Sequence, residues 1–446
     1  LHLLSRRQRQ MCIRDRLKGI PVAISQTSGN INFDNLDADL KLNSNLNNSQ
    51  LNIDGKIKDT FANVKVVSNK FNLGDGIKTL PENTKVPYKN DISSINTSFI
   101  AKYSGSTENI DYDKLYLKGK IYSNKGAKSS LIVDNSTFEL SSSNFKLPLL
   151  KGTFKNSPFN ITAFVTDAFS SNRIVNGNCK FNSLDLNLIN DSAIQILLTP
   201  ETAKELKNID FLKGKINLSA RIRNNNLNAY TVLDDISLVY KPKHMKIAVN
   251  SGNMFLRNDL LHLNKINAQL GKMPLFIDGK IANVQKNPDL NLYINAKPNQ
   301  EFFDQFFNNN ALYPIKLKGD AILSSKASGT LDNLNTKSEL KLQENSSLYY
   351  MGASIGDIEN PVRITVDNTY SPDKIRINNL QYDKIILSQN NKPFVTPQLN
   401  ASGTIQLLSD NNAGFNNFKI KTQSPTDAKI FNIIFRKPFM KQGVFT

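Results

Sequence analysis

Apolar and polar residues alternate along most of this chain. Residues 215–223 and 289–298 each place an aliphatic side chain at every second position, with Lys, Asn, Asp, Ser or Arg between them. Successive side chains of a β-strand point to opposite faces of the sheet, so this period of two predicts strands with one apolar and one polar face. Clusters such as 123–126 and 223–226, rich in Asn, Ser and Gly, separate the alternating segments. These residues favour tight turns, so the chain is predicted to form antiparallel hairpins and meanders.

Helical patterns are few. Residues 191–208 contain Thr-Pro-Glu followed by helix-forming residues, 299–307 contain four Phe spaced along one helical face, and 424–437 begin with Pro-Thr-Asp before an apolar run. We expect short helices in these three segments. We interpret them as plugs at the ends or corners of a sheet; a gating or docking role is the alternative.

A weak repeat of the form apolar-x-apolar-x-Gly-x-apolar recurs along the chain, with the glycine on the apolar face. A glycine within a strand marks a bend, a bulge or the close approach of another group. Repeated on one face, it is predicted to let the sheet curl toward that face. The structural glycines of the repeat, of its looser copies and of a later Gly-Thr-Leu motif are Gly55, Gly119, Gly152, Gly214, Gly279, Gly319, Gly329 and Gly403.

A sheet with one apolar face must cover that face, and the predicted helices are too few to form a second layer. The fold class expected is therefore all-β with few short helices. It is an elongated, curled antiparallel β-sheet groove of about 25–30 strands, a β-taco or open elongated barrel with repeats. An outer-membrane barrel would face its apolar side chains outward and carry aromatic girdles, whereas this chain has no Trp.

The aliphatic positions of the repeat face are the candidate lining of the groove. They are Leu51, Ile53, Ile57, Leu115, Leu117, Ile121, Ile216, Leu218, Ile222, Leu275, Ile277, Ile281, Leu290, Leu292, Ile294 and Leu317. Ordinary sheet core is the alternative interpretation for each of them. The lysines that flank the glycines, Lys118, Lys120, Lys213 and Lys215, are expected to form a solvated outer face rather than phosphate ligands.

The first 16 residues resemble one reading frame of a sequencing-library adapter, so we expect the natural sequence to begin near Leu17 and to have lost whatever preceded it. Without them Lys+Arg falls from 56 to 51 and Asp+Glu from 38 to 37, which lowers the net charge from +18 to +14. The remaining basic charge favours anionic partners such as phospholipid head groups. No motif of the known nucleic-acid-binding modules is present, so no nucleic acid partner is expected.

Few residues suit catalysis or metal binding. Beyond the first 16 residues the chain has one cysteine, Cys179, and two histidines, His244 and His262. We find no nucleophile elbow, no metal-spaced His/Glu cluster and no phosphate-binding glycine loop. The adjacent acids Asp234 and Asp235 would face opposite sides of a strand. We therefore expect no enzyme activity, no metal and no cofactor.

The segment 315–342 carries the clearest family signature. Gly329-Thr330-Leu331-Asp332-Asn333, followed by an alternating strand, resembles the repeating motif of the AsmA/TamB superfamily. Leu334 stands where the motif usually has Pro. Residues 275–298 carry a related form, and 425–446 are similar to the helix-then-glycine-strand joins of that family.

The resemblance implies an AsmA-like or TamB-like envelope protein of a bacterium with two membranes. Such a protein is anchored in the inner membrane by an N-terminal helix, and its periplasmic β-groove is thought to carry phospholipid toward the outer membrane for outer-membrane biogenesis. The implied partners are phospholipid, the inner membrane through an anchor absent from this fragment, and an outer-membrane protein.

The domain organisation expected from the pattern follows the chain order. It comprises 1–16 as adapter, 17–190 as the first part of the groove, 191–208 as a helical insertion, 209–298 as groove, 299–309 as a short aromatic helix, and 310–446 as groove that continues past the last residue given. Two other functions stay open: a surface β-rich adhesin or glycan-binding protein, and a passive structural spacer.

Overall fold

A computed structural model describes most of the chain. The described residues are 13–17, 20–34, 37–78, 86, 89–124, 126, 129–190, 207–284, 286–306, 314–350, 353–357, 359–382, 385–389, 392–396, 398–407, 413–423, 425–428 and 441–445. The chain divides into two compact units. Unit 1 comprises 1–203 and 216–229, and unit 2 comprises 204–215 and 230–446.

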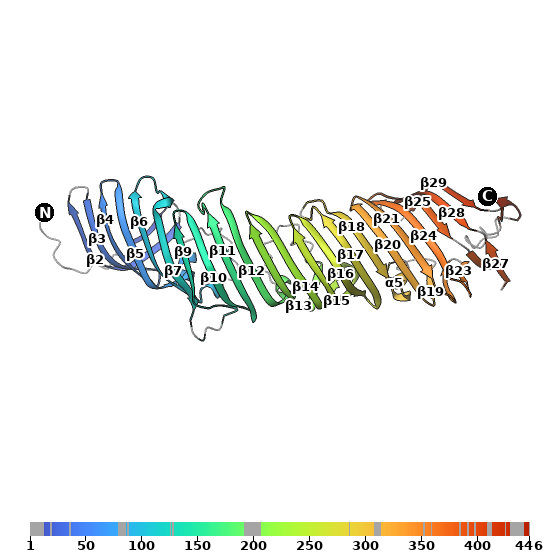
Figure 1. The fold of residues 1–446 in the computed structure, drawn as a ribbon, viewed down its shortest axis with the longest axis horizontal. Helices are drawn as coiled ribbons and strands as arrows, with labels where there is room; N and C mark the ends of the chain where they lie inside the picture. The colour runs from blue at the N-terminus through green and yellow to red at the C-terminus, as the bar shows by residue number, and fades with distance from the viewer. Residues whose placement is uncertain are drawn as a thin grey trace. The chain divides into compact units, whose positions relative to one another are not determined.

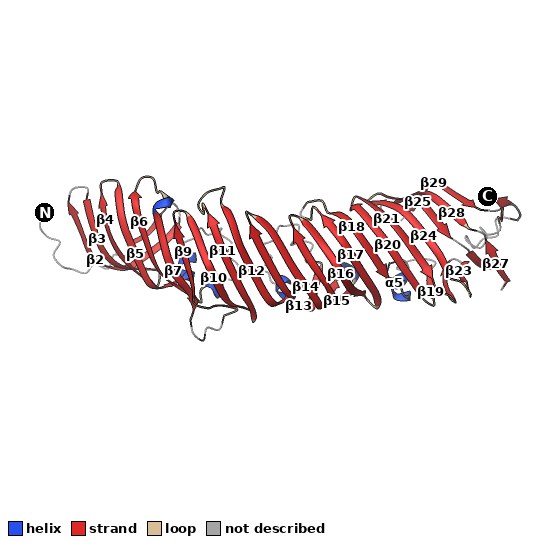
Figure 2. Cartoon of the chain, viewed as in Figure 1, coloured by secondary structure: helices blue, strands red, loops and turns tan. Residues whose placement is uncertain are grey.

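Among the described residues, strands predominate and helices are few and short (Figure 2). The helices are α1 (Leu73–Ile77), α2 (Lys89–Ile92) and α5 (Gln300–Phe306), with 3-10 turns η1 (Tyr112–Lys114), η2 (Leu186–Asn190) and η3 (Lys241–Lys243). The main antiparallel sheet comprises 24 of the described strands, and a second sheet comprises five (Figure 1).

Unit 1 is a meander in which consecutive strands pair, with one exception. Its strands are β1 (Ile13–Leu17), β2 (Ile20–Asp34), β3 (Asp37–Leu46), β4 (Ser49–Lys58), β5 (Phe61–Asn72), β6 (Ile95–Ser106), β7 (Leu115–Ser123), β8 (Leu131–Val133), β9 (Ser136–Ser141), β10 (Asn144–Phe154), β11 (Ser157–Thr166) and β12 (Ile174–Asp185). The exception is that β7 pairs with β9 and β8 pairs with β10. The short strands β8 and β9 act as one interrupted strand, because both pair with β10 at different positions along it. Strands β13 (Ile209–Arg223) and β14 (Asn226–Tyr240) carry residues of both units.

Unit 2 continues with a second meander. Its main strands are β15 (Met245–Arg257), β16 (Leu260–Leu270), β17 (Met273–Ala282), β18 (Asp289–Ala296), β20 (Ala321–Thr330), β21 (Asn333–Leu342), β24 (Val362–Ser371), β25 (Lys374–Tyr382), β28 (Leu399–Leu407) and β29 (Ala413–Thr422). Within the described pairings β1 pairs only with β2, and β29 pairs only with β28, so the main sheet is not closed on itself.

The second sheet of unit 2 is formed by short strands that adjoin main-sheet strands in the chain. Its strands are β19 (Lys316–Lys318), β22 (Ser346–Tyr350), β23 (Ala353–Asp357), β26 (Ile385–Gln389) and β27 (Lys392–Thr396), paired in that order. Each of them directly precedes or follows a main-sheet strand, so the chain bends repeatedly from one sheet into the other. The bend between β19 and β20 lies at Gly319, whose φ of +81° is left-handed. A Cβ there would stand 2.9 Å from Cα of Ser346, so this corner requires glycine.

Two-residue turns of Asn, Asp or Ser join many strands. Asn224 and Asn225 both have positive φ between β13 and β14, and Asn258 and Asp259 repeat this between β15 and β16. Two consecutive left-handed residues form the type I′ turn, which matches the twist of the flanking strands. The turn predicted at 223–226 is therefore confirmed.

The largest buried side chains of the apolar face gather toward one end of the strands in each unit. In unit 1 the core cluster is Ile95, Val133 and Phe159, with Phe181 packed at a ring-centroid distance of 5.6 Å from Phe159. In unit 2 the buried residues gather where the main sheet meets the second sheet, as Leu342, Val362 and Leu399 show. Away from these ends most residues of the same face are half-buried, and a few, such as Ala62, Leu140 and Ala327, are buried.

The predicted fold class, all-β with few short helices in an open, curled antiparallel sheet, is confirmed. The helix expected at 299–307 is also confirmed, because α5 spans Gln300–Phe306 and Asn299 Oδ1 accepts a hydrogen bond from the backbone N of Phe302 at 3.0 Å. The helix start expected at 425–427 is wrong. Thr426–Asp427 form strand β30, paired with β31 (Val444–Phe445), because the backbone there finds partners across the hairpin. Most of the expected helix at 191–208, residues 191–206, and the remainder of 424–437 beyond residue 428 lie outside the described residues.

Candidate functional site

An uninterrupted hydrocarbon row crosses nine strands of unit 1. Residues directly opposed in an antiparallel pair lie on the same face, so the strand registers identify its members. In order across β3, β4, β5, β6, β7, β9, β10, β11 and β12 they are Leu42, Ile53, Val66, Ala101, Leu117, Leu140, Phe145, Val165 and Val175. Leu140 is buried, and the other eight are half-buried. We call this set the unit 1 row.

All sixteen predicted lining residues are half-buried; none is fully buried and none is strongly exposed. Ile53 and Leu117, from two copies of the repeat, fall in the unit 1 row. Leu115 precedes Leu117 by two residues on β7, so it lies on the same face in the adjacent row, opposite Tyr103. Ile57 lies opposite Ala38 and Ala62 on the same face.

The predicted residues of unit 2 fall into parallel rows. Ile277 and Ile294 are directly opposed, as are Ile281 and Leu290. Leu275 lies opposite Ala296. Leu317 is separate from them, because it belongs to β19 of the second sheet and pairs with Leu348.

Polar residues interrupt the apolar face of unit 2 at three neighbouring strands. The row of Ile277 and Ile294 continues into Ser325 and Ser338, whose hydroxyls share a hydrogen bond of 2.8 Å. On the adjacent row Thr336 Oγ1 donates to Oδ1 of Asn368 at 2.5 Å. No charged residue occurs in these rows. Each of these polar side chains forms a hydrogen bond with another one, which reduces the free-energy cost of placing them on an apolar surface.

Glycines of the repeat provide space for aromatic rings. Gly119 lies between Phe99 and Phe138 on the neighbouring strands, and a Cβ at Gly119 would be 2.7 Å from Cζ of Phe138. At Gly152 a Cβ would overlap the backbone O of Ile132 and would be 2.8 Å from Cζ of Phe159. The backbone φ of both glycines is ordinary for a strand, so the absent side chain, and not an unusual backbone, explains glycine at these two sites.

The eight glycines thus divide by geometry. Three of them, Gly55, Gly119 and Gly152, have a φ that is ordinary for a β-strand. The other five have a positive φ: Gly214, Gly279, Gly319, Gly329 and Gly403.

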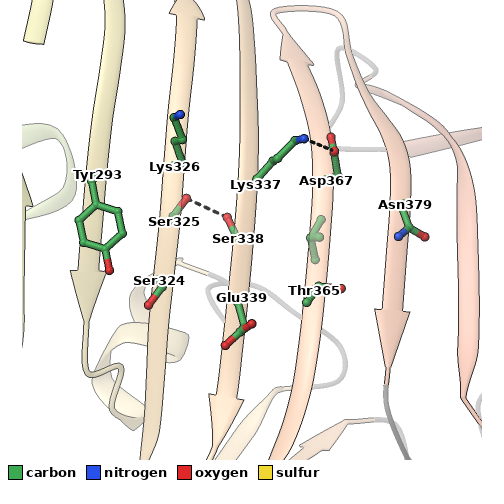
Figure 3. Close-up of a pocket in the computed structure, with 11 residues that line it drawn as sticks. Tyr293, Ser324, Ser325, Lys326, Lys337, Ser338, Glu339, Thr365, Asp367 and Asn379 are labelled. Carbon is green, nitrogen blue, oxygen red and sulfur yellow. Dashed lines mark hydrogen bonds and ion pairs between the residues drawn. The ribbon is translucent and has the colours of Figure 1, made fainter. Parts of the chain in front are cut away.

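The opposite face is polar and charged. The four lysines that flank repeat glycines are exposed, as expected, and two of them form ion pairs: Lys118 with Glu139 at 3.6 Å, and Lys213 with Asp235. Tyr293, Lys326, Lys337, Asp367 and Asn379 line up across five strands, and an open hollow of about 360 Å³ lies over them (Figure 3). The ion pair between Lys337 and Asp367, at 3.5 Å, spans part of this hollow.

Burial shifts the pKa of two side chains on the apolar face. Cys179 is opposed to Ile161, and burial raises the pKa of its thiol. Tyr382 is opposed to Ile364 and Leu399, and burial raises the pKa of its phenol. The thiol and the phenol therefore stay neutral at physiological pH, which keeps charge off this face.

Several residues of the unit 1 row lie outside the glycine repeat and were not predicted. Phe145, Val165 and Val175 join the row through strand register alone. Their alternation marks each as one face of a strand, but register depends on turns and bulges, such as the shift between Leu147 and Leu150.

Comparison with protein-family models, with curated proteins and with solved structures gives no match. Among the described residues no helix combines the length and apolar composition that a membrane crossing requires. In the same part of the chain no group of three or more His, Cys, Asp or Glu side chains is placed to hold a metal ion.

Proposed function

We propose that this protein binds phospholipid tails on the apolar face of its sheet and carries them without chemistry. The observation that supports this is the unit 1 row: nine successive strands present hydrocarbon only, and eight of the nine side chains stay half-buried. A core residue would be expected to be covered by a second layer, whereas most of this row stays accessible to solvent.

The dimensions of the row suit acyl chains. Nine strands at about 4.8 Å spacing extend over roughly 38 Å. A bilayer core is about 30 Å thick, so one tail occupies about 15 Å of it. The row therefore accommodates two tails end to end.

The energetics favour such a surface. Exposing acyl chains to water costs about 0.8 kcal/mol per CH₂, or on the order of 12 kcal/mol for a sixteen-carbon tail. A sheet that covers one side of the tail removes about half of this cost. Binding by an apolar surface needs no catalytic group and no cofactor, so the activity proposed is non-enzymatic.

The location and partners follow from the resemblance to the AsmA/TamB superfamily, which we propose as the family of this chain. In this proposal the protein lies in the periplasm of a two-membrane bacterium. The inner membrane and an outer-membrane protein are its proposed partners.

Native mass spectrometry of the gently extracted protein tests the proposal. We expect peaks shifted from the protein mass by whole phospholipids. A clean protein mass after extraction from a lipid-containing host would contradict it, and would favour the passive spacer instead.

One observation favours the second candidate, a glycan-binding surface protein. Tyr112 and Phe169 stack at 4.4 Å, and both are about half exposed, at 47% and 49%. Asp111, Asp113 and Asp167 line the same hollow of about 400 Å³. Exposed aromatic faces beside carboxylates can stack on sugar rings and accept hydrogen bonds from hydroxyls. Binding to a glycan array that is lost in Tyr112→Ala would support this candidate, and binding to no glycan would exclude it.

A further inference from the structure

A cavity of about 460 Å³ lies in unit 2 where β18 ends. Ala296, the last residue of β18, is paired with Leu275 of β17 on one side and with Leu323 of β20 on the other. Lys297 N still donates a hydrogen bond to the backbone O of Pro274 at 3.1 Å, and beyond Lys297 the chain leaves the sheet toward α5. Strands β17 and β20 therefore lose the neighbour that they share, and the space between them at this end remains open.

The chemistry of the lining is that of an anion site. The side-chain Nε2 of Gln343 is buried and donates to no acceptor among the described residues. Lys272 and Lys297 also line the cavity, both are exposed, and neither forms an ion pair within the described part of the chain. Asp320 is the one carboxylate of the lining, so the formal charge of the lining is +1.

We propose that this cavity binds a singly charged phosphate group. A buried N–H without an acceptor is unfavourable and rare in proteins, so a ligand oxygen is the missing partner of Gln343. The two lysines select an anion over a neutral carbonyl group, and lysine is a common phosphate ligand. Asp320 disfavours a dianion, which makes a phosphodiester a better fit than a phosphomonoester.

The position of the cavity relates it to the lipid surface. Leu317 and Ala321 also line it, and Ala321 is opposed to Leu342 on the apolar face. A phospholipid whose phosphate lies here could place its tails on that face. The identification of the phosphate as a lipid headgroup rests on the function proposed above, whereas the anion site itself does not.

The test compares three ligands and three variants of the full chain. The ligands are dioctanoyl phosphatidylglycerol, which carries a phosphodiester, dioctanoylglycerol, which carries the same tails without phosphate, and inorganic phosphate. Binding is measured by isothermal titration calorimetry for the wild type, for Lys272→Gln/Lys297→Gln and for Gln343→Met. A control variant, Lys102→Gln/Lys120→Gln, removes the same charge from exposed positions of unit 1.

We expect phosphatidylglycerol to bind about tenfold more weakly to both cavity variants, as the loss of a hydrogen bond to a charged group predicts. Dioctanoylglycerol binding and the control variant should be unchanged. Gln343→Met should unfold at no lower temperature than the wild type, because it removes an unpaired buried donor. This separates a binding defect from a folding defect.

The outcomes separate this proposal from the preceding one. If the wild type binds both lipids equally well, the headgroup site is refuted and the carriage of tails stands. If neither lipid binds but inorganic phosphate binds and is lost in the cavity variants, the anion site stands with free phosphate as its ligand, and lipid carriage fails. If no phosphate compound binds, the anion site is refuted.

Discussion

A carboxylate in the middle of the unit 1 row should reduce tail binding strongly. Leu117 is half-buried and lies between Ala101 and Leu140, on strands that all contribute hydrocarbon to the row. In Leu117→Asp, an acyl chain that crosses β7 must desolvate an ionised group or leave this part of the surface. We therefore expect the variant to bind tails more weakly and to remain folded, because the position is only half-buried.

The magnitude follows from the geometry. A tail about 15 Å long covers about three strands at 4.8 Å spacing. A sixteen-carbon tail covered on one side gains about 6 kcal/mol, half of the full transfer value. Losing one strand of three removes about 2 kcal/mol, which corresponds to a roughly 30-fold weaker affinity.

The assay measures displacement of a lipid with a fluorescent acyl chain, with thermal unfolding as the check on folding. Thr137→Asp is the matched control, because it adds the same charge on the opposite, exposed face of neighbouring strand β9. A folded Leu117→Asp protein with wild-type affinity would refute the assignment of this face as the lipid surface. Equal losses in both variants would show that charge, and not the apolar row, determines binding.

Three further predictions concern other parts of the molecule. Gly119→Val should lower the free energy of unfolding by about 1–3 kcal/mol, measured by urea denaturation, because the new side chain overlaps the backbone O of Ser98 and the ring of Phe138. An unchanged midpoint would contradict this packing. Alkylation of Cys179 by iodoacetamide, followed by peptide mass spectrometry, should be slow at pH 8 and faster above pH 9, because the pKa of the thiol is raised. Added phospholipid should slow the alkylation further. A rate that is already maximal at pH 8 would contradict this prediction. Gln300→Leu should increase amide hydrogen exchange at Leu317. The Gln300 side chain accepts a hydrogen bond from Leu317 N at 2.7 Å and donates one to Ile315 O at 3.0 Å, and the variant loses both. Unaltered exchange would show that this contact does not protect the Leu317 amide.

The pairing of Gln300 with β19 explains how the second sheet ends. Its amide forms the two hydrogen bonds that a further strand would form with the edge of β19. An uncovered edge strand invites pairing with another chain, so α5 protects the sheet at this position. The interpretation of the aromatic helix as a plug at a sheet end agrees with this contact.

The alternation of residues was sufficient to determine the class of fold. A strict period of two predicts strands with one apolar face, and Asn-rich clusters such as 223–226 favour tight turns, so an antiparallel meander was predicted from local chemistry alone. The half-buried state of Ile53 and Leu117 also agrees with the expectation of a one-sided sheet that no helical layer covers.

Only the tertiary structure decided which strands bring their apolar positions into one row and where that row is covered. Register depends on bulges and turns, which shift a strand without leaving a periodic signal, so Phe145 and Val175 could not be assigned to the row with Leu117 from sequence. The second sheet, the bend at Gly319 and the cavity beside Gln343 likewise depend on contacts between residues distant in the chain. Alternation reports the face on which a side chain lies, whereas its neighbours across the sheet are set by long-range pairing.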